Sequence, residues 1–141
     1  MEIQEILGYQ LGTSSRLIKR TMESSLTNYD ITTPQWSVLK LLNTREQLTQ
    51  SQIANELVGD KATVGEVILR LSEKGYIEKS FHDHDRRVHL IRLTAKAKEA
   101  VKNIEKMVPD ITEKALQGFS EEDRELLHKF LNQIIDNLKG E

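Results

Sequence analysis

The chain opens with apolar residues spaced three and four positions apart, from Ile3 through Leu17 and Ile18 to Leu26. This is the period of a helix with one apolar face, and it predicts an amphipathic α-helix of roughly 25 residues. Polar residues interrupt the pattern throughout, so the segment does not resemble a membrane span. We expect residues 1–33 to form a helix whose apolar face needs a partner, because isolated helices are marginal in water.

Shorter helices follow, and two of them have recognisable start signals. Thr33 is the expected N-cap of the first, with Pro34 in the first helical position, where its missing N–H is tolerated. Thr49 and Gln52 fit a capping box, in which each side chain bonds the other residue's backbone N–H. This box predicts a second short helix over 49–58.

A third helix is predicted over 61–74, directly after a turn at Gly59. Asp60 is the expected N-cap, and Gly75 supplies a left-handed stop. A helical wheel separates a core face from an exposed face that is rich in small and polar residues. The predicted core residues are Val64, Val67, Ile68 and Leu71.

After Gly75 the period changes from helical to alternating, which predicts two β-strands over 77–82 and 88–93. Residues 83–87 form the polar tip of the hairpin between them. Three compact helices closed by a hairpin are the components of a winged helix-turn-helix. In that arrangement one helix enters the DNA major groove and the hairpin, or wing, reaches a neighbouring groove. We therefore predict that 34–93 is a DNA-binding region.

Beyond the hairpin the helical period returns. Thr94 is expected to cap a long helix that Pro109 kinks, and Ser120 is expected to begin a last helix. The apolar stripes of these helices predict that 94–141 joins 1–33 in dimerisation. The expected fold is mainly α with a small β-hairpin wing (α+β). It combines a winged helix-turn-helix with a helical dimerisation region and has about six helices.

Composition narrows the possible functions. The 141 residues include no cysteine, which excludes disulfides and thiol chemistry. The sequence contains neither a glycine-rich phosphate loop nor a Gly-x-Ser-x-Gly motif, so we expect no enzyme and no cofactor. It also lacks a secretory signal and an apolar run of about 18 residues. We expect a soluble, cytoplasmic protein without membrane contact.

The charge distribution is more informative than the net charge of −2, which is unusual for a DNA-binding protein. Residues 34–93 carry nine basic and eight acidic side chains. Positive charge is concentrated in the short stretch 79–92, which contains Lys79, Arg86, Arg87 and Arg92. This places the basic side chains on the expected wing.

Three segments stand out as motifs: residues 31–39, residues 71–79, and residues 83–94, which contain Asp85-Arg86-Arg87. They resemble, in turn, the start of the second helix, the end of the recognition helix, and the wing with its Asp-x-Arg signature in the MarR family of bacterial transcriptional regulators. The resemblance implies an obligate homodimer, built from the N- and C-terminal helices, that binds pseudopalindromic double-stranded DNA. It also implies release by a small molecule. We expect a repressor with a phenolic or other small anionic effector.

The resemblance implies that Arg87 enters the minor groove, where A·T tracts concentrate negative potential, while Asp85 holds its guanidinium. On the recognition helix, Arg70 can bind a phosphate or a guanine. Glu66 either accepts a hydrogen bond from cytosine or pairs with Arg70, and we favour the pair. The predicted DNA-binding residues are Gln50, Ser51, Gln52, Lys61, Ala62, Thr63, Gly65, Glu66, Arg70, Lys79, Arg86 and Arg87.

Several alternatives stay open at this point. The effector-site candidates are Tyr9, Arg16 and Trp36, although packing or solvation explains each of them equally well. The wing histidines His82 and His84 could make a metal-responsive regulator, but solvated histidines without a metal are favoured. A winged helix can also be a protein-interaction module, and the wing could be an ordinary polar hairpin with a surface salt bridge.

Overall fold

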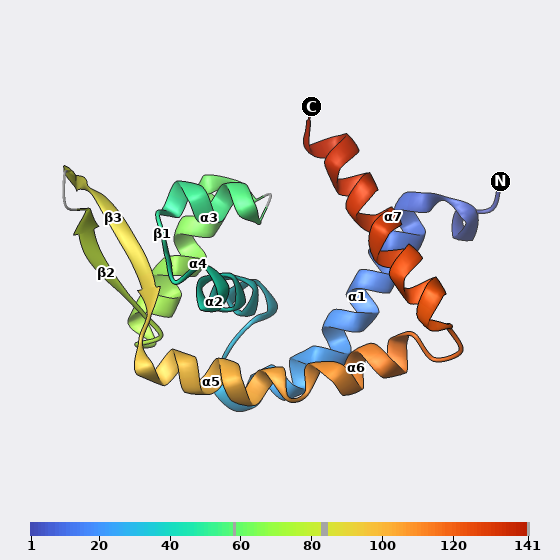
Figure 1. Ribbon diagram of the computed structural model, residues 1–141, viewed down its shortest axis with the longest axis horizontal. Helices are drawn as coiled ribbons and strands as arrows, with labels where there is room; N and C mark the ends of the chain where they lie inside the picture. Colours follow the sequence, from blue (N-terminus) through green and yellow to red (C-terminus); the bar gives the residue numbers. More distant parts are fainter. Residues whose placement is uncertain (58, 83–84, 141) are drawn as a thin grey trace.

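The computed structural model describes residues 1–57, 59–82 and 85–140, and for residues 82 and 85–88 it describes the backbone only. Its helices and strands run along the chain as shown in Figure 1. The elements are η1 (Ile3–Glu5), α1 (Leu7–Leu26), η2 (Thr27–Tyr29), α2 (Thr33–Arg45), β1 (Gln47–Leu48), α3 (Gln50–Glu56), α4 (Lys61–Glu73), β2 (Ile77–His82), β3 (Asp85–Leu93), α5 (Ala95–Glu105), α6 (Val108–Ala115) and α7 (Glu121–Lys139).

The hydrophobic core lies in one half of the molecule. Within the described residues, every buried apolar side chain falls between Leu26 and Ile104, and we call residues 26–104 the head. The core joins α2, α3 and α4 to the sheet and to the inner face of α5. Its most deeply buried large side chains include Leu39, Leu42, Ile53, Ile68, Leu71 and Ile91. The predicted winged helix-turn-helix is therefore the packed part of the chain.

The predicted helix caps Thr49, Asp60 and Thr94 are confirmed, and Ser120, which was predicted to begin the last helix, also caps it. Each cap side chain accepts a hydrogen bond from the backbone N–H three residues later, which satisfies one of the free donors at a helix start. The left-handed stop is confirmed as well, since Gly75 has φ of +78° directly after α4.

The predicted cap of α2 is wrong by one residue. Thr32 is the N-cap, and its hydroxyl oxygen accepts from the backbone N of Gln35 at 3.3 Å. In return, the backbone N of Thr32 donates to Oε1 of the Gln35 side chain at 3.1 Å. Thr33 is the first helical residue and Pro34 the second. The capping box, which needs a Gln or Glu three residues after the cap, selects Thr32.

The sheet has three antiparallel strands in the order β1–β3–β2. The two-residue strand β1 pairs Gln47 with Arg92 and Leu48 with Ile91, and the alternation of residues does not reveal so short a strand. β3 begins at Asp85, three residues before the predicted start. The two predicted strands are otherwise confirmed, and residues 85–87, which were predicted for the hairpin tip, belong to β3.

The long helix predicted after Thr94 is not a single kinked helix. α5 ends at Glu105, and α6 begins at Val108 with Pro109 in its first turn. A proline there needs no backbone donor, so it begins a new helix instead of bending an existing one. Arg124 fixes the next turn by a bidentate ion pair to Glu113, at 2.8 and 3.0 Å.

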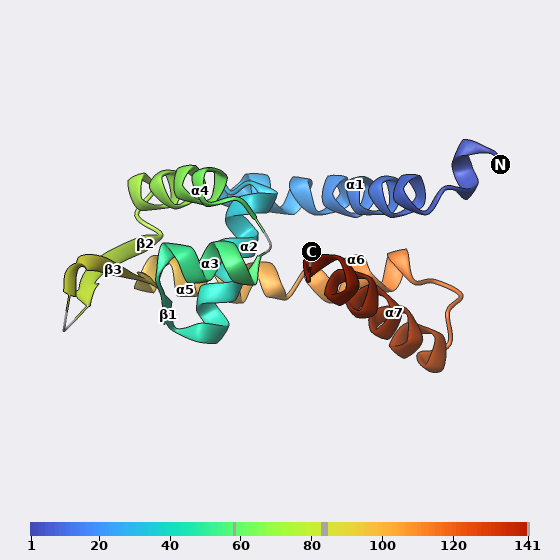
Figure 2. The ribbon, with the colours of Figure 1, turned by 90° about the horizontal axis from the view of Figure 1, so that it is seen from above.

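The terminal helices, α1, α6 and α7, extend from the head (Figure 2). Within the described part of the chain, α6 and α7 contain no buried residue, and α1 contains only Leu26. Several large apolar side chains on α7 are exposed, for example Phe130 at 57% and Leu138 at 65%. No helix in the ranges 1–57, 59–82 and 85–140 is long and apolar enough to cross a membrane.

Candidate nucleic-acid interface

Helices α3 and α4 form a compact pair within the head (Figure 1). Ile53 and Ala54 of α3 are buried in the same cluster as Val64 and Ile68 of α4. Leu71 is also buried and Val67 is half-buried, so the core face predicted for α4 is confirmed. The opposite face of α4 is therefore turned outward.

The outward face of α4 carries most of the predicted DNA-binding residues of this helix. Its exposed side chains are Lys61, Ala62, Thr63, Glu66, Leu69 and Arg70. Small residues near the start of the helix leave the backbone accessible, which lets a helix approach base edges closely. The arrangement is typical of a helix that inserts into the DNA major groove.

Thr63 is less free than the sequence indicates. Its hydroxyl donates to Oδ2 of Asp60 at 2.6 Å, and its backbone N donates to Oδ1 of the same carboxylate at 2.9 Å. These two hydrogen bonds hold the pKa of Asp60 below its usual value. The Thr63 hydroxyl proton is thus committed to the cap, and only its oxygen lone pairs remain for a DNA donor.

The predicted ion pair on α4 is present. Nε of Arg70 lies 3.1 Å from Oε1 of Glu66, and its Nη1 lies 3.3 Å from Oε2 of Glu73. All three side chains are more than half exposed, where such pairs contribute roughly 0–1 kcal/mol each. Replacing either carboxylate by a DNA phosphate would therefore cost little free energy.

Helix α3 supports the start of α4 through Gln50. The Gln50 side-chain amide donates to the backbone O of Lys61 at 3.3 Å. A Cβ at Gly65 would lie 2.8 Å from that amide nitrogen, so the glycine makes room for Gln50. Gln52 is held in the capping box with Thr49, at 2.9 Å. Two of the three polar residues predicted to touch DNA from α3 therefore also have a structural role.

A cleft of about 400 Å³ lies between the starts of α3 and α4 and the inner side of the wing. It brings together four of the predicted residues, which come from separate parts of the chain. Its lining consists of Thr49, Gln50, Ser51, Lys61, Lys79, His89 and Ile91. The two lysines give the cleft the positive charge that a DNA backbone requires.

His89 is a cleft residue that the predicted DNA-binding set lacks. Its ring packs edge-on against Phe81, with the ring centroids 5.0 Å apart. Phe81 pairs with His89, and Lys79 pairs with Ile91, in the β2–β3 ladder. Side chains alternate between the two faces of a strand, so residues 89 and 91 lie on the same face. This spacing was the sequence feature that could have predicted His89 as a cleft residue.

The side chains of the wing signature lie outside the part of the chain that the structure describes. Asp85, Arg86 and Arg87 lie in β3, where the structure describes their backbone only, and the tip residues Asp83 and His84 are not described. The roles assigned to these residues, and to the histidine pair His82 and His84, stay predictions. Arg92, at the base of the wing, pairs with Glu78 across the strands at 2.8 Å.

The three effector candidates are not brought together. Tyr9 and Arg16 lie on exposed positions of α1, while Trp36 is buried in the head. One side of Trp36 borders a hollow of about 430 Å³ whose other described lining residues are Met22, Lys40, Glu105, Val108 and Pro109.

In the described ranges, no three His, Asp or Glu residues are arranged to hold a metal ion.

A packed helix pair, an outward polar helix face, a basic cleft and a two-stranded wing define a winged helix-turn-helix of the DNA-binding class. Comparison with known proteins specifies the family. A family model described as the MarR family matches residues 31–89. The uncharacterized HTH-type transcriptional regulator YwoH of Bacillus subtilis (strain 168) is 32% identical over 129 residues, covering 89% of this chain and 93% of that protein. The chain belongs to the MarR family of transcriptional regulators.

Solved structures agree on the fold. A cysteine-to-serine mutant of MarR from E. coli, complexed with operator DNA, superimposes with a TM-score of 0.86 at 19% identity and covers 96% of this chain and 99% of that one. BpsR of Bordetella bronchiseptica, described in connection with regulation of its DNA binding by 6-hydroxynicotinic acid, gives 0.88 at 22% identity, with coverages of 96% and 97%.

Proposed function

We propose that this regulator works as a homodimer that binds an inverted-repeat operator and represses transcription. The observation that carries the proposal is the division of the molecule into a packed head, with an outward polar helix and a basic cleft, and terminal helices with exposed apolar faces. Paired terminal helices would bury those faces. They would also place two heads one DNA turn apart, about 34–36 Å centre to centre.

In this proposal, α4 enters the major groove and the wing reaches the adjacent minor groove. Lys61, Lys79 and Ser51, which meet in the cleft, contact the DNA backbone, and Arg87 extends into the minor groove. Arg70 exchanges a carboxylate partner for a phosphate or a guanine. The exposed face of α4 and the charge of the cleft support these assignments.

We also propose that a small aromatic acid modulates the regulator from the hollow beside Trp36. An indole side chain offers an apolar surface to an aromatic ring, and Lys40 offers a cation to a carboxylate. Lys40 is paired with Glu105, so binding of an acid would exchange one carboxylate for another. The hydroxynicotinic acid associated with the structurally similar BpsR belongs to this chemical class.

The direct test is selection from a random duplex pool, followed by footprinting with the wild type and with Arg87→Ala. We expect an inverted repeat whose two halves are protected one turn apart, and weaker protection at the flanks with Arg87→Ala. For the selected site, log K should fall with log[salt] with a slope of about −0.9 per phosphate contacted. An affinity that does not change with salt would instead favour a protein-interaction module.

A further inference from the structure

The tripeptide Lys74–Gly75–Tyr76 joins the two elements that are proposed to contact DNA. α4 ends at Glu73 and β2 begins at Ile77, and the left-handed Gly75 makes the sharp turn between them. Any rotation of this tripeptide relative to its surroundings moves α4 and the wing together. Its contacts therefore decide how α4 and the wing are held against the rest of the chain.

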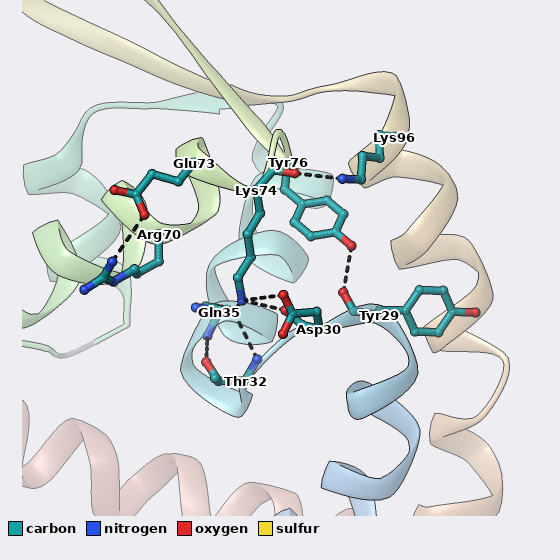
Figure 3. A network of polar contacts seen from close by, with 9 residues as sticks. All are labelled: Tyr29, Asp30, Thr32, Gln35, Arg70, Glu73, Lys74, Tyr76 and Lys96. Carbon is teal, nitrogen blue, oxygen red and sulfur yellow. Dashed lines mark hydrogen bonds and ion pairs between the residues drawn. The ribbon is translucent and has the colours of Figure 1, made fainter.

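Side chains on both sides of Gly75 bind the connection between α1 and α2 (Figure 3). Nζ of Lys74 donates to the backbone O of Asp30 at 2.5 Å, and the Tyr76 hydroxyl donates to the backbone O of Tyr29 at 2.8 Å. These are consecutive carbonyls at the end of η2, the turn that follows α1. The tripeptide is thus bound to the connection that leads from α1 into α2 by two adjacent hydrogen bonds.

Lys74 also reaches the start of α2. Its Nζ donates to Oε1 of Gln35 at 2.9 Å, the same oxygen that accepts from the backbone N of Thr32. Gln35 is only 6% exposed, and the Lys74 side chain is 24% exposed. The two short hydrogen bonds of a half-buried ammonium group contribute more to stability than the contact of a lysine on the surface. Lys74 therefore does more than offset the dipole at the end of α4.

The beginning of α5 binds the same tripeptide from the other side. Nζ of Lys96 donates to the backbone O of Lys74 at 2.7 Å and lies 4.6 Å from the centroid of the Tyr76 ring. The Thr94 hydroxyl donates to the backbone O of Gly75 at 2.8 Å, and the Thr94 backbone N donates to the backbone O of Tyr76 at 3.1 Å. All three carbonyls of the tripeptide are bound by residues at the start of α5.

We propose that Lys74 and Tyr76 are positioning residues that set the angle at which α4 and the wing stand against α1 and α5, and thereby the half-site spacing that the dimer accepts. The inference rests on the proposed dimeric operator binding. The 13 residues of α4 span about 20 Å. A rotation of about 10° at the tripeptide therefore moves the far end of α4 by about 3.5 Å, which is one base-pair step.

The experiment measures binding to a library of the selected inverted repeat in which the spacer between the half-sites is varied by single base pairs. Four proteins are compared: the wild type, Lys74→Met, Tyr76→Phe and Lys102→Met. Met keeps the unbranched stem of Lys74 without its donors, and Phe keeps the ring of Tyr76 without its hydroxyl. Lys102 is exposed on α5, so its variant controls for the lost positive charge.

We expect the wild type and Lys102→Met to prefer one spacer sharply. Lys74→Met should bind that spacer about tenfold more weakly and accept spacers one or two base pairs longer or shorter. Tyr76→Phe should show the same broadening to a smaller extent. Binding to a single half-site, and the salt dependence of that binding, should stay unchanged, because the surface that contacts DNA is intact.

An unchanged spacer profile in both variants would overturn the inference. If Lys74→Met does not fold, as judged by circular dichroism, Tyr76→Phe alone decides the question, because it removes one hydroxyl. A uniform loss of affinity at every spacer and at the single half-site would mean general destabilisation, which also contradicts a positioning role. If the wild type selects no inverted repeat at all, the proposed dimeric function fails instead, and the two failures are therefore distinguishable.

Discussion

The head and the terminal helices are built from the same kinds of residues but are stabilised differently. In the head, α2, α3, α4, the sheet and α5 enclose fully buried side chains such as Leu39 and Ile53. In α7, by contrast, Phe130 and Leu138 stay more than half exposed within one chain. The head therefore encloses its own core, whereas the apolar faces of the terminal helices stay exposed in a single chain. The proposed dimer would cover these faces.

The largest expected effect tests this contrast with one substitution in each region. Leu39→Ala should lower the free energy of unfolding by about 2–5 kcal/mol, because it leaves a cavity in a closed core. Leu138→Ala should change the stability of the head by less than about 0.5 kcal/mol, because its side chain is exposed in the single chain. Urea unfolding followed by the fluorescence of Trp36, the only tryptophan and a head residue, measures both. Equal losses would remove the contrast between the two regions.

A charge in the apolar face of α7 should separate subunits without unfolding the head. Phe130→Asp is expected to weaken dimerisation by about 100-fold, since a carboxylate would be desolvated in a closed interface. Asn132→Asp adds the same charge on the opposite side of α7 and is the matched control. Sedimentation equilibrium gives the dimer constants. If both variants dimerise like the wild type, the exposed face of α7 is not the interface.

Helix caps allow a milder version of the same comparison. Thr49→Ala removes the cap of α3 in the head, and Ser120→Ala removes the cap of α7. Each should destabilise its own helix by about 1 kcal/mol. The first loss should appear as a lower urea midpoint of the Trp36 signal at any protein concentration. The second should appear as a weaker dimer constant, and a change in the urea midpoint of monomeric protein would contradict it.

Local features of this fold were the ones that the sequence predicted well. The caps at Thr49, Asp60 and Thr94 and the stop at Gly75 each depend on residues within four positions of one another. The core face of α4 follows from helical periodicity, and the Glu66–Arg70 pair follows from the spacing of one helical turn. These features need no knowledge of distant parts of the chain.

Features that depend on distant residues could not be predicted. Strand β1 exists because β3 lies beside it, and two residues are too few to show a period. Gly65 is small because Gln50, from another helix, occupies the space next to it. Lys74 looks like an ordinary helix-end lysine until Asp30 and Gln35 are placed beside it. The residues that position α4 and the wing are thus the ones that only the fold reveals.

The smallest expected effect is a response to acid, which two carboxylates with lowered pKa values, one in each region, allow us to test. In the head, hydrogen bonds from Thr63 lower the pKa of Asp60. At the α6–α7 turn, the guanidinium of Arg124 lowers the pKa of Glu113. A carboxyl whose pKa is lower in the folded protein stabilises it above the unfolded pKa. That contribution is lost as pH falls through the folded pKa, below about pH 4.

The expected readouts differ between the regions in the same way. Asp60→Asn keeps a capping side chain but no longer titrates, so its urea midpoint should fall less steeply with acid than that of the wild type. Glu113→Gln should flatten the acid dependence of the dimer constant and leave the midpoint for the head unchanged. Both titrations run from pH 6 downward at constant ionic strength, because surface ion pairs are screened by salt. If Glu113→Gln changed the Trp36 unfolding curve and not the dimer constant, the α6–α7 turn would stabilise the head and not the dimer, which contradicts the comparison.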